Sequence, residues 1–386
     1  MTDSTGPDVL IHGDTHSSAA LRHELPLGII DPFSYFEVSG RRVAVIASME
    51  AGRVKEAAPD VEVIDPYALG LDELIDRGMH WHEIDSELCL RAANELGARR
   101  LVVPAALPVS VADRLRAEGI EVEPDEPEFV RRRRAKNAAE LDGLRRAQAA
   151  ADDAMAAAAE MLRSAVAHDG TLMLDGEPLS SERVRARLRE VCAGHNAPAP
   201  EDIIVAAGAA GASGHEQGTG PLPAGIPIII DIWPRDERTG CWADMTRTFV
   251  AGGEPADDVA RWHELSRLAL NRVLEEVRPG VTGRELFALA CDVFEEAGEL
   301  TQRTKAEGET LLDGFFHSLG HGVGLEVHEE PALGRTGSDG LVAGDVLAVE
   351  PGCYRSGYGG VRLEDLVLVT EDGCERLTEF PYELLP

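Results

Sequence analysis

Acidic side chains stand at the ends of apolar runs in the second half of this 386-residue chain. Asp231 follows the run IPIII directly, Glu350 follows DVLAV, and Glu364 lies inside VRLEDLVLV. An unpaired carboxylate beside a hydrophobic core is energetically costly, so each of these residues needs a partner. Salt bridges or solvation at a strand end would satisfy any one of them alone. Their recurrence, together with Asp244, points instead to bound cations.

The four carboxylates form two similar pairs. Asp231 and Asp244 flank the turn-rich segment PRDERTG, and Glu350 and Glu364 flank RSGYGG. This spacing lets the two members of each pair face one another across a β-hairpin. Two hairpins of the same kind predict an internally duplicated domain.

A histidine-rich segment adds a second kind of ligand. FFHSLGHGVGLEVHEEPAL contains His317, His321 and His328, and a glycine on each side of His321 lets backbone and metal approach closely. Two divalent cations would neutralise four carboxylates and a neutral imidazole. A donor set rich in oxygen suits Mn²⁺, Co²⁺, Fe²⁺ or Zn²⁺. Two such ions can activate a shared water, which predicts a hydrolase.

The charge balance limits the partners. The chain has 37 basic and 69 acidic side chains, a formal net charge of −32, so we expect neither nucleic acid nor an anionic membrane as a partner. The polar N-terminus does not resemble a signal peptide, and no window approaches the ~18 apolar residues of a membrane helix. Six scattered cysteines without a CxxC pair favour free thiols in a reducing compartment. We therefore expect a soluble, cytoplasmic protein.

Two domains are expected to position these residues. Residues 1–25 read as a loose tail, and residues 26–135 alternate β-branched runs with amphipathic stretches, which indicates a smaller α/β domain with a mostly parallel sheet. The prolines and charge run of PDEPEFVRRRRAKN suit an inter-domain linker. Residues 136–386 combine amphipathic helices with apolar strands, which predicts an α+β domain.

Five motifs in this second domain carry a resemblance to a known family. In chain order they are IIIDIW, ADMTRTF, HSLGHGVGLEVHE, VEPGCY and GGVRLED. The sequence resembles the M24 metallopeptidases of the pita-bread (creatinase/aminopeptidase) fold, and among them the Xaa-Pro peptidases, prolidase and aminopeptidase P, which carry a creatinase-like N-terminal domain. The resemblance implies an α+β fold whose pita-bread domain has a pseudo-twofold duplication and follows the smaller α/β domain.

The resemblance also implies an activity and roles for residues. The activity is hydrolysis of a small peptide at Xaa-Pro, as a dipeptidase or aminopeptidase, by a homodimer with two divalent ions per chain, Mn²⁺ or Co²⁺ favoured and Zn²⁺ or Fe²⁺ also suitable. Glu350 would act as acid and base toward a metal-bridging hydroxide, and His328 and His215 would assist catalysis and contact the substrate. His317 and Arg362 would also contact the substrate. The implied metal ligands are Asp231, Asp244, His321, Glu350 and Glu364.

Some residues depart from the family pattern. Cys241 stands where an aromatic residue is usual, with Trp242 shifted by one, and Trp233 stands where a glycine is common. The turn between the two aspartates is also longer than usual. These changes bear on the substrate preference.

Alternatives remain open at this stage. One is an enzyme of the same fold that acts on another small substrate, as an amide hydrolase of compatible-solute metabolism or a lyase. Another is a non-catalytic pita-bread binding protein. Arg362 could either pair with a metal-bound carboxylate or hold a substrate carboxylate through a bidentate fork.

Overall fold

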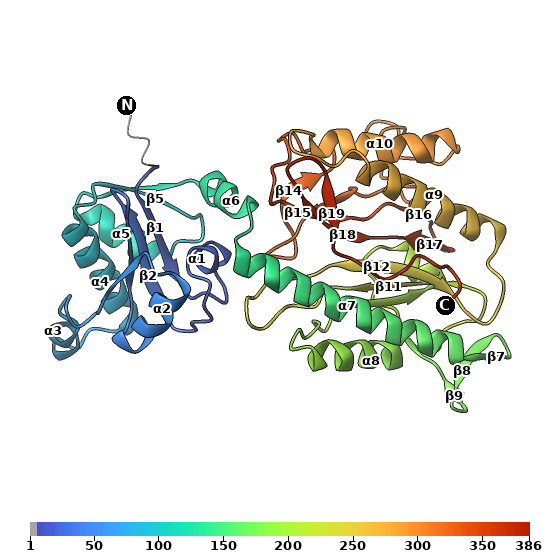
Figure 1. Cartoon of the computed structure of the whole chain (residues 1–386), viewed down its shortest axis with the longest axis horizontal. Coiled ribbons are helices and arrows are strands. Elements are labelled where there is room, and N and C mark those ends of the chain that lie inside the picture. Colours follow the sequence, from blue (N-terminus) through green and yellow to red (C-terminus); the bar gives the residue numbers. More distant parts are fainter. Residues whose placement is uncertain (1–5) are drawn as a thin grey trace. The chain divides into compact units, whose positions relative to one another are not determined.

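A computed structural model describes residues 6–386, and the chain divides into two compact units (Figure 1). One unit extends to Arg133 and the other runs from Arg134 to Pro386. The sequence places the boundary near residue 135. Each unit is described by itself below.

A mixed sheet forms the centre of the N-terminal unit. Its strand order is β4-β3-β2-β1-β5-β6, in which β1–β2 and β2–β3 are antiparallel and the other three pairings are parallel. The elements are β1 (Val9–Gly13), α1 (Ala19–Glu24), β2 (Phe33–Val38), β3 (Arg41–Val45), the 3₁₀ turn Ser48–Glu50, α2 (Ala51–Ala57), β4 (Val61–Ile64), α3 (Leu71–Asp76), α4 (Trp81–Leu96), β5 (Arg100–Val103), α5 (Val109–Ala117), β6 (Glu121–Pro124) and α6 (Glu126–Arg134).

The described part of the expected tail is ordered, and the expected linker contains the boundary between the two units but is helical. The described part of the expected tail contains β1, which pairs with β2 on one side and β5 on the other, and α1. The short run Val9–Ile11 is fully buried in the sheet, although the residues that flank it in the sequence are polar and do not indicate a strand. The expected linker contains α6, in which Glu128 forms ion pairs with Arg131 and Arg132 one turn later.

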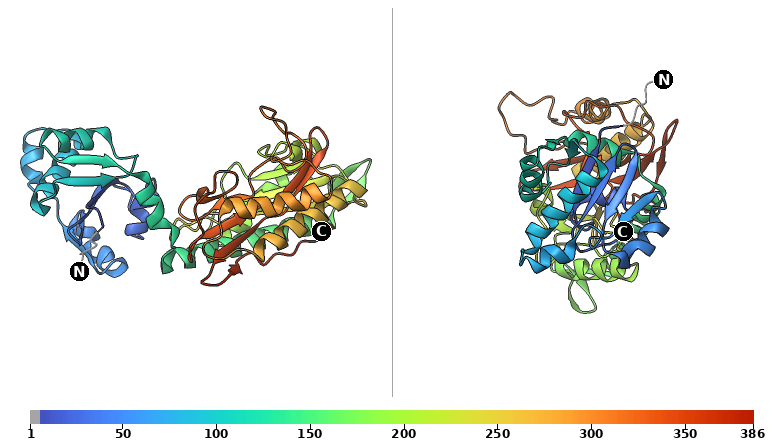
Figure 2. Two further views of the ribbon diagram at one scale, coloured as in Figure 1. Left: turned by 90° about the horizontal axis from the view of Figure 1, so that it is seen from above. Right: turned by 90° about the vertical axis from the view of Figure 1, so that its left-hand side faces the viewer.

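The C-terminal unit is built from two similar halves. In the first, α7 (Ala138–Ser164) packs on α8 (Ser181–Gly194), and they cover an antiparallel sheet, β10-β11-β12. In the second, α9 (Asp257–Leu274) lies beside α10 (Gly283–Glu296), and they pack on strands of the sheets β14-β13-β15-β18-β19 and β16-β17 (Figure 2). The repetition of two helices and an antiparallel sheet agrees with the predicted duplication.

The strands of the C-terminal unit are short. The first half contains a hairpin sheet of β7 (Val166–His168), β8 (Thr171–Leu174) and β9 (Glu177–Pro178), followed by β10 (Ile204–Ala207), the 3₁₀ turn Gly208–Ala212, β11 (Pro227–Ile232) and β12 (Met245–Val250). The second half contains β13 (Gly320–Gly322), β14 (Glu329–Leu333), β15 (Val346–Val349), β16 (Gly352–Arg355), β17 (Gly359–Arg362), β18 (Asp365–Val369) and β19 (Cys374–Arg376).

Small residues explain the close contact of α7 with its neighbours. The helix begins with a capping box between Asn137 and Glu140. Its buried face carries alanines at helical spacing, and their short side chains let the helices approach closely. The buried alanines are Ala147, Ala150, Ala151, Ala154, Ala158 and Ala159.

Arg247 of β12 ties the C-terminal segment to the sheet. Its guanidinium is buried, pairs with Asp365 at 2.9 Å, and donates to the carbonyls of Phe380 at 2.7 Å and Pro381 at 2.9 Å. A further N–H of Arg247 donates to the carbonyl of Glu364 at 2.6 Å. The end of the chain is therefore connected to the segment that carries one of the acidic residues discussed above.

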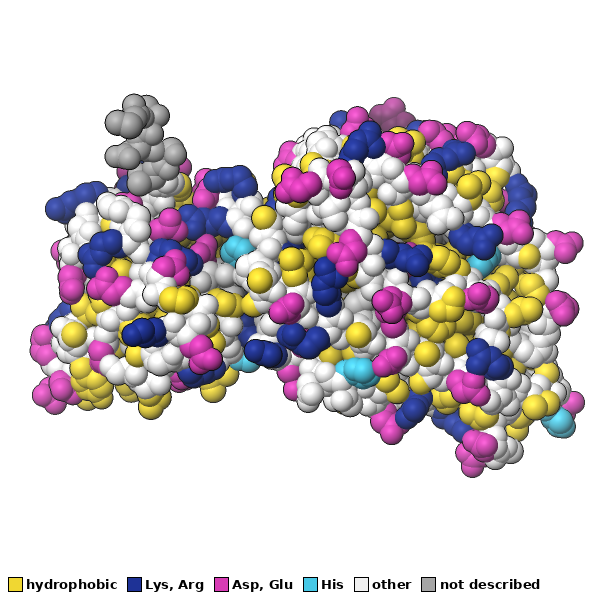
Figure 3. Space-filling model, viewed as in Figure 1, with side chains coloured by type: hydrophobic (Ala, Val, Ile, Leu, Met, Phe, Trp, Pro, Cys, Tyr) yellow, Lys and Arg dark blue, Asp and Glu magenta, His cyan; other side chains and the backbone are white. Residues whose placement is uncertain are grey.

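The surface shows no single charged patch on the face drawn in Figure 3, where acidic and basic side chains are interspersed. Within residues 6–386, no helix combines the length and the apolar character needed to cross a membrane. All six cysteines are free and five are buried, which agrees with the predicted free thiols.

Candidate metal centre

The first pair of acidic residues lies on one face of the β11–β12 hairpin. Asp231 pairs with Thr246, and Ile232 pairs with Met245. The next position in the same register places Asp244 opposite residue 233, diagonal to Asp231. Because side chains alternate between the faces of a strand, the two carboxylates lie on the same face.

The second pair lies at a break between two ladders. Val349 pairs with Asp365 in β15–β18, and Gly352 pairs with Arg362 in β16–β17. Both ladders keep one register, which places Glu350 opposite Glu364 in the gap between them. Pro351 follows Glu350 and has no N–H to donate, which suits an interrupted ladder.

His321 of β13 joins these carboxylates. It pairs with Ala348 of β15, two residues before Glu350. Its Nε2 lies 3.7 Å from Asp244 Oδ2 and 3.9 Å from Glu350 Oε1. Ligand atoms of Asp244, His321 and Glu364 all lie within 4.8 Å of one another, so these three residues can hold a metal ion.

The imidazole of His321 is held in the form that binds metals. Its Nδ1 lies 3.0 Å from the carbonyl oxygen of Gly322, and because a carbonyl can only accept, Nδ1 carries the hydrogen. The lone pair is then on Nε2, which is directed at the carboxylates. Burial lowers the pKa of His321 to about 4 and keeps the ring neutral.

The carboxylates of the cluster destabilise one another as anions. Burial, followed by the charges of Glu364, Asp231 and Glu350, raises the pKa of Asp244 well above its ordinary value. Burial and the charges of Asp231 and Glu350 also raise the pKa of Glu364. Burial raises the pKa of Glu350 to about 7, with Asp231 adding to the shift and Arg362 opposing it. A bound cation would relieve this repulsion.

Arg362 is a buried part of the cluster. Its guanidinium forms an ion pair with Asp231, donates from Nε to Thr246 Oγ1 at 3.2 Å and donates from Nη1 to Tyr354 Oη at 3.3 Å. The same Nε lies 3.9 Å from Glu350 Oε2. Of the two roles left open by the sequence, these contacts favour pairing with the carboxylate ligands.

Two residues of the site were not singled out from the sequence. The hydroxyl of Thr246 is fully buried and donates to Glu364 Oε2 at 2.8 Å. Its position two residues after Asp244 on a strand is a signal that could have identified it. Tyr354 Oη lies 3.0 Å from His317 Nε2 and connects that histidine to Arg362.

The three other predicted histidines lie around the cluster. His328 is exposed, and its ring stands perpendicular to that of His321 with the centroids 4.3 Å apart. His317 is half-buried, and its pKa falls to about 3 because of burial and the charge of Arg362. His215 is exposed in the turn after Ser213, and its charge contributes to the lowered pKa of His317.

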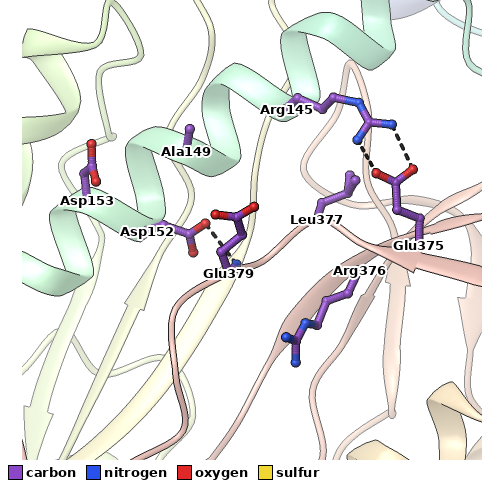
Figure 4. Close-up of a pocket in the computed structure, with 8 residues that line it drawn as sticks. All are labelled: Arg145, Ala149, Asp152, Asp153, Glu375, Arg376, Leu377 and Glu379. Carbon is purple, nitrogen blue, oxygen red and sulfur yellow. Dashed lines mark hydrogen bonds and ion pairs between the residues drawn. The ribbon is translucent and has the colours of Figure 1, made fainter.

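A separate hollow of about 290 Å³ lies between α7 and the C-terminal segment (Figure 4). Arg145 pairs with both oxygens of Glu375, at 2.6 and 2.9 Å. Asp152 accepts the backbone N–H of Glu379 at 3.0 Å. These charged groups already satisfy one another, so we assign this hollow no ligand.

Comparison with known proteins agrees with the carboxylate cluster. Residues 142–371 match the model of metallopeptidase family M24, and this range includes all five predicted ligands. The chain belongs to this family. The resemblance read from the motifs is therefore confirmed.

Relatives within the M24 family extend the comparison. "Probable dipeptidase PepE" of Mycobacterium tuberculosis is 35% identical over 256 residues, which cover 66% of this chain and 61% of that protein. The Xaa-Pro dipeptidase of Pyrococcus furiosus is 36% identical over 185 residues, which cover 48% of this chain and 49% of that protein. The chain thus matches about half to three fifths of the length of these curated relatives.

A solved structure matches nearly the whole chain. The Xaa-Pro dipeptidase from Bacillus anthracis superimposes with a TM-score of 0.78 at 26% identity, covering 98% of this chain and 94% of that one. The predicted fold is thereby confirmed: an α+β M24 pita-bread unit preceded by a smaller α/β unit.

Proposed function

We propose that this M24 protein hydrolyses peptide bonds that precede proline, as a dipeptidase or aminopeptidase, with two divalent metal ions per chain. The observation that carries the proposal is the convergence of four carboxylates and one neutral imidazole from two hairpins and β13. The names of the relatives from P. furiosus and B. anthracis support a peptidase activity at Xaa-Pro, and the name of the M. tuberculosis relative supports a dipeptidase.

The donor set fits divalent ions. Asp231 Oδ1 is buried and has no hydrogen-bond partner among the described residues, so a lone pair is available to a metal. Oxygen donors with one imidazole suit Mn²⁺ or Co²⁺ and also accept Zn²⁺ or Fe²⁺. The residues that would hold the ions are Asp231, Asp244, His321, Glu350 and Glu364. When bound, such ions lower the pKa of water and stabilise negative charge on a carbonyl oxygen.

The chain's own residues supply proton transfer and positioning. Glu350 lies beside His321 and Arg362 in the cluster, and its carboxylate would accept a proton from the attacking water and return it to the leaving group. Thr246 and Arg362 hold Glu364 and Asp231 in place. His328 and His215 are exposed and can donate hydrogen bonds to a substrate. The Nδ1–H of His317 donates to the carbonyl of Ser318 and its Nε2 accepts from Tyr354, so this ring would contact a substrate through its face or edge.

Three further features stay predictions from the sequence. They are the creatinase-like character of the N-terminal unit and the homodimer, which the resemblance implies, and the cytoplasmic location, which the composition and the polar N-terminus suggest. Size measurement of the purified protein tests the second of these.

Metal analysis combined with peptide assays tests the function. We expect two Mn²⁺ or Co²⁺ ions per chain and release of proline from Ala-Pro, with little turnover of Ala-Ala. A longer substrate, Ala-Pro-Ala, distinguishes aminopeptidase from dipeptidase activity. Glu350→Gln serves as the inactive control, because it removes the proton acceptor. Fewer than one ion per chain, or turnover of no proline substrate by metal-loaded protein, would overturn the proposal.

A further inference from the structure

The hairpin that carries Asp231 and Asp244 continues outward beyond them. Ala243 N–H donates to Pro234 O at 2.9 Å, and Asp236 N–H donates to Cys241 O at 2.8 Å. Arg235 forms an antiparallel bridge with Trp242 in the same register as β11–β12. The two segments therefore keep the register of the strands as far as the turn, although the regular strands end at Ile232 and Met245.

This register places three large side chains on the face of the metal ligands. Trp233 stands opposite Asp244, and Arg235 stands opposite Trp242. Residues two apart on a strand share a face, so Trp233 and Arg235 follow Asp231 on the same side. In antiparallel pairs that exchange no hydrogen bonds, as at these two positions, facing side chains lie close together. Trp233, Arg235 and Trp242, which we call the hairpin strip, are all half-buried.

The Arg235 guanidinium has N–H donors that make no hydrogen bond with the described residues. Its Nε donates to Gly240 O at 2.9 Å, and its guanidinium lies over the Trp242 ring, 5.2 Å from the centroid. No hydrogen bond within residues 6–386 uses its terminal Nη groups, and no carboxylate there pairs with it. Burial lowers the pKa of the Arg235 guanidinium without an acidic neighbour to offset it. Such a position is unusual in a chain with 69 acidic and 37 basic residues.

The position of Arg235 relative to the ligands suits a substrate. A strand advances about 3.3 Å per residue, so Arg235 stands about 7 Å along the hairpin from the position opposite Asp244. That distance corresponds to about two residues of an extended peptide. Stacking on Trp242 holds the planar guanidinium in one orientation, which favours bidentate binding of a carboxylate.

We propose that the hairpin strip is a substrate subsite in which Arg235 binds a carboxylate of the peptide. The inference rests on the proposed peptidase function and adds to it a preference for acidic substrates. The carboxylate can be the C-terminus of a dipeptide or an acidic side chain before the scissile bond. Arg362 is less suited to this task, because its Nε, Nη1 and Nη2 each contact a group of the metal centre.

Two pairs of substrates isolate each source of the carboxylate. Ala-Pro against Ala-Pro-amide tests the C-terminal carboxylate, and Glu-Pro-amide against Gln-Pro-amide tests the side chain. The measured quantity is the ratio of kcat/KM within each pair, so that a general loss of activity cancels. A hydrogen-bonded charge predicts a ratio of about 10 to 100 in the wild type for one pair and a ratio near one in Arg235→Gln.

Matched variants make the test specific. Arg238→Gln removes the same charge from an exposed position in the turn of the same hairpin and should keep the wild-type ratio. Arg235→Lys keeps the charge without the planar fork and should give an intermediate ratio. The subsite is refuted if both ratios are near one in the wild type, or if Arg235→Gln leaves them unchanged, or if Arg238→Gln abolishes them equally.

A binding measurement separates failure of the subsite from failure of the proposed function. If metal-loaded wild type cleaves no Xaa-Pro peptide, the function fails, and calorimetric titration with proline against prolinamide and with glutamate against glutamine then decides the inference. Tighter binding of either acid than of its neutral partner, lost in Arg235→Gln, supports the subsite. Equal binding of acid and neutral partner in the wild type overturns it.

Discussion

Thr246→Val should weaken metal binding without replacing any metal ligand. The hydroxyl of Thr246 donates to Glu364 Oε2 at 2.8 Å and accepts from Arg362 Nε at 3.2 Å, and the residue is fully buried. Valine keeps the volume and removes both hydrogen bonds, so a buried carboxylate oxygen loses its donor. Loss of a hydrogen bond that orients a ligand typically lowers metal affinity by about 10 to 100-fold, which equals about 1.4 to 2.7 kcal/mol.

Calorimetric titration of chelator-treated protein with Mn²⁺ measures this loss. The effect should grow as the pH falls, because the hydroxyl stabilises the anionic form of Glu364 and its removal raises the pKa of that carboxyl further. Protons then compete more strongly with the metal in the variant than in the wild type.

Thr248→Val provides the control. Thr248 is buried on the same strand, and its hydroxyl donates to the carbonyl of Arg362 and accepts from its N–H, both at 3.0 Å. It contacts no carboxylate, so its loss should cost stability but change Mn²⁺ affinity by no more than about threefold, or about 0.65 kcal/mol. If Thr246→Val keeps wild-type affinity, or if both variants lose affinity equally, the positioning role of Thr246 is refuted.

Three further predictions concern the same centre. Between pH 6.5 and 8 the metal-free protein should become less stable as the pH rises, because the fold raises the pKa values of Asp244, Glu364 and Glu350. His317 and His321 titrate below this range in the folded protein. Thermal unfolding with and without Mn²⁺ checks this prediction, and a melting temperature that rises with pH in the metal-free protein would contradict it. His328→Ala should lower kcat for Ala-Pro and leave KM nearly unchanged, and the reverse pattern would argue for ground-state binding. Tyr354→Phe removes one hydrogen bond to His317 and one to Arg362, so it should reduce kcat/KM about tenfold and also lower the melting temperature, whereas a lower melting temperature with unchanged kcat/KM would mark the hydroxyl as purely structural.

The residues of the acidic cluster could be selected from the sequence because their signals are local. An acidic residue that ends an apolar strand is visible in the sequence, and so is a histidine between glycines. The pairing across each hairpin followed from the turn-rich segments. The break between β15–β18 and β16–β17 was not predicted, although Pro351 offered a clue.

Other features depend on contacts between distant segments. The run Val9–Ile11 is too short and too polar in its surroundings to be recognised as β1, and only its burial between β2 and β5 explains it. The role of Tyr354 depends on the meeting of β16 with the segment before β13, which no spacing reveals. Pro127 and the arginines of α6 do not indicate a helix in the sequence, and the ion pairs of Glu128 with Arg131 and Arg132 help to explain it.

The duplicated architecture gives a bound ion a mechanical role. Asp231 and Asp244 come from the half that contains α7 and α8, and His321, Glu350 and Glu364 come from the half that contains α9 and α10. Neither half has the complete donor set, so an ion shared by both acts as a cross-link between them. At a free concentration of 100 times Kd, each ion would contribute about 2.7 kcal/mol to holding the halves together. Removal of the proposed ions by a chelator should therefore make it easier for the two halves to separate.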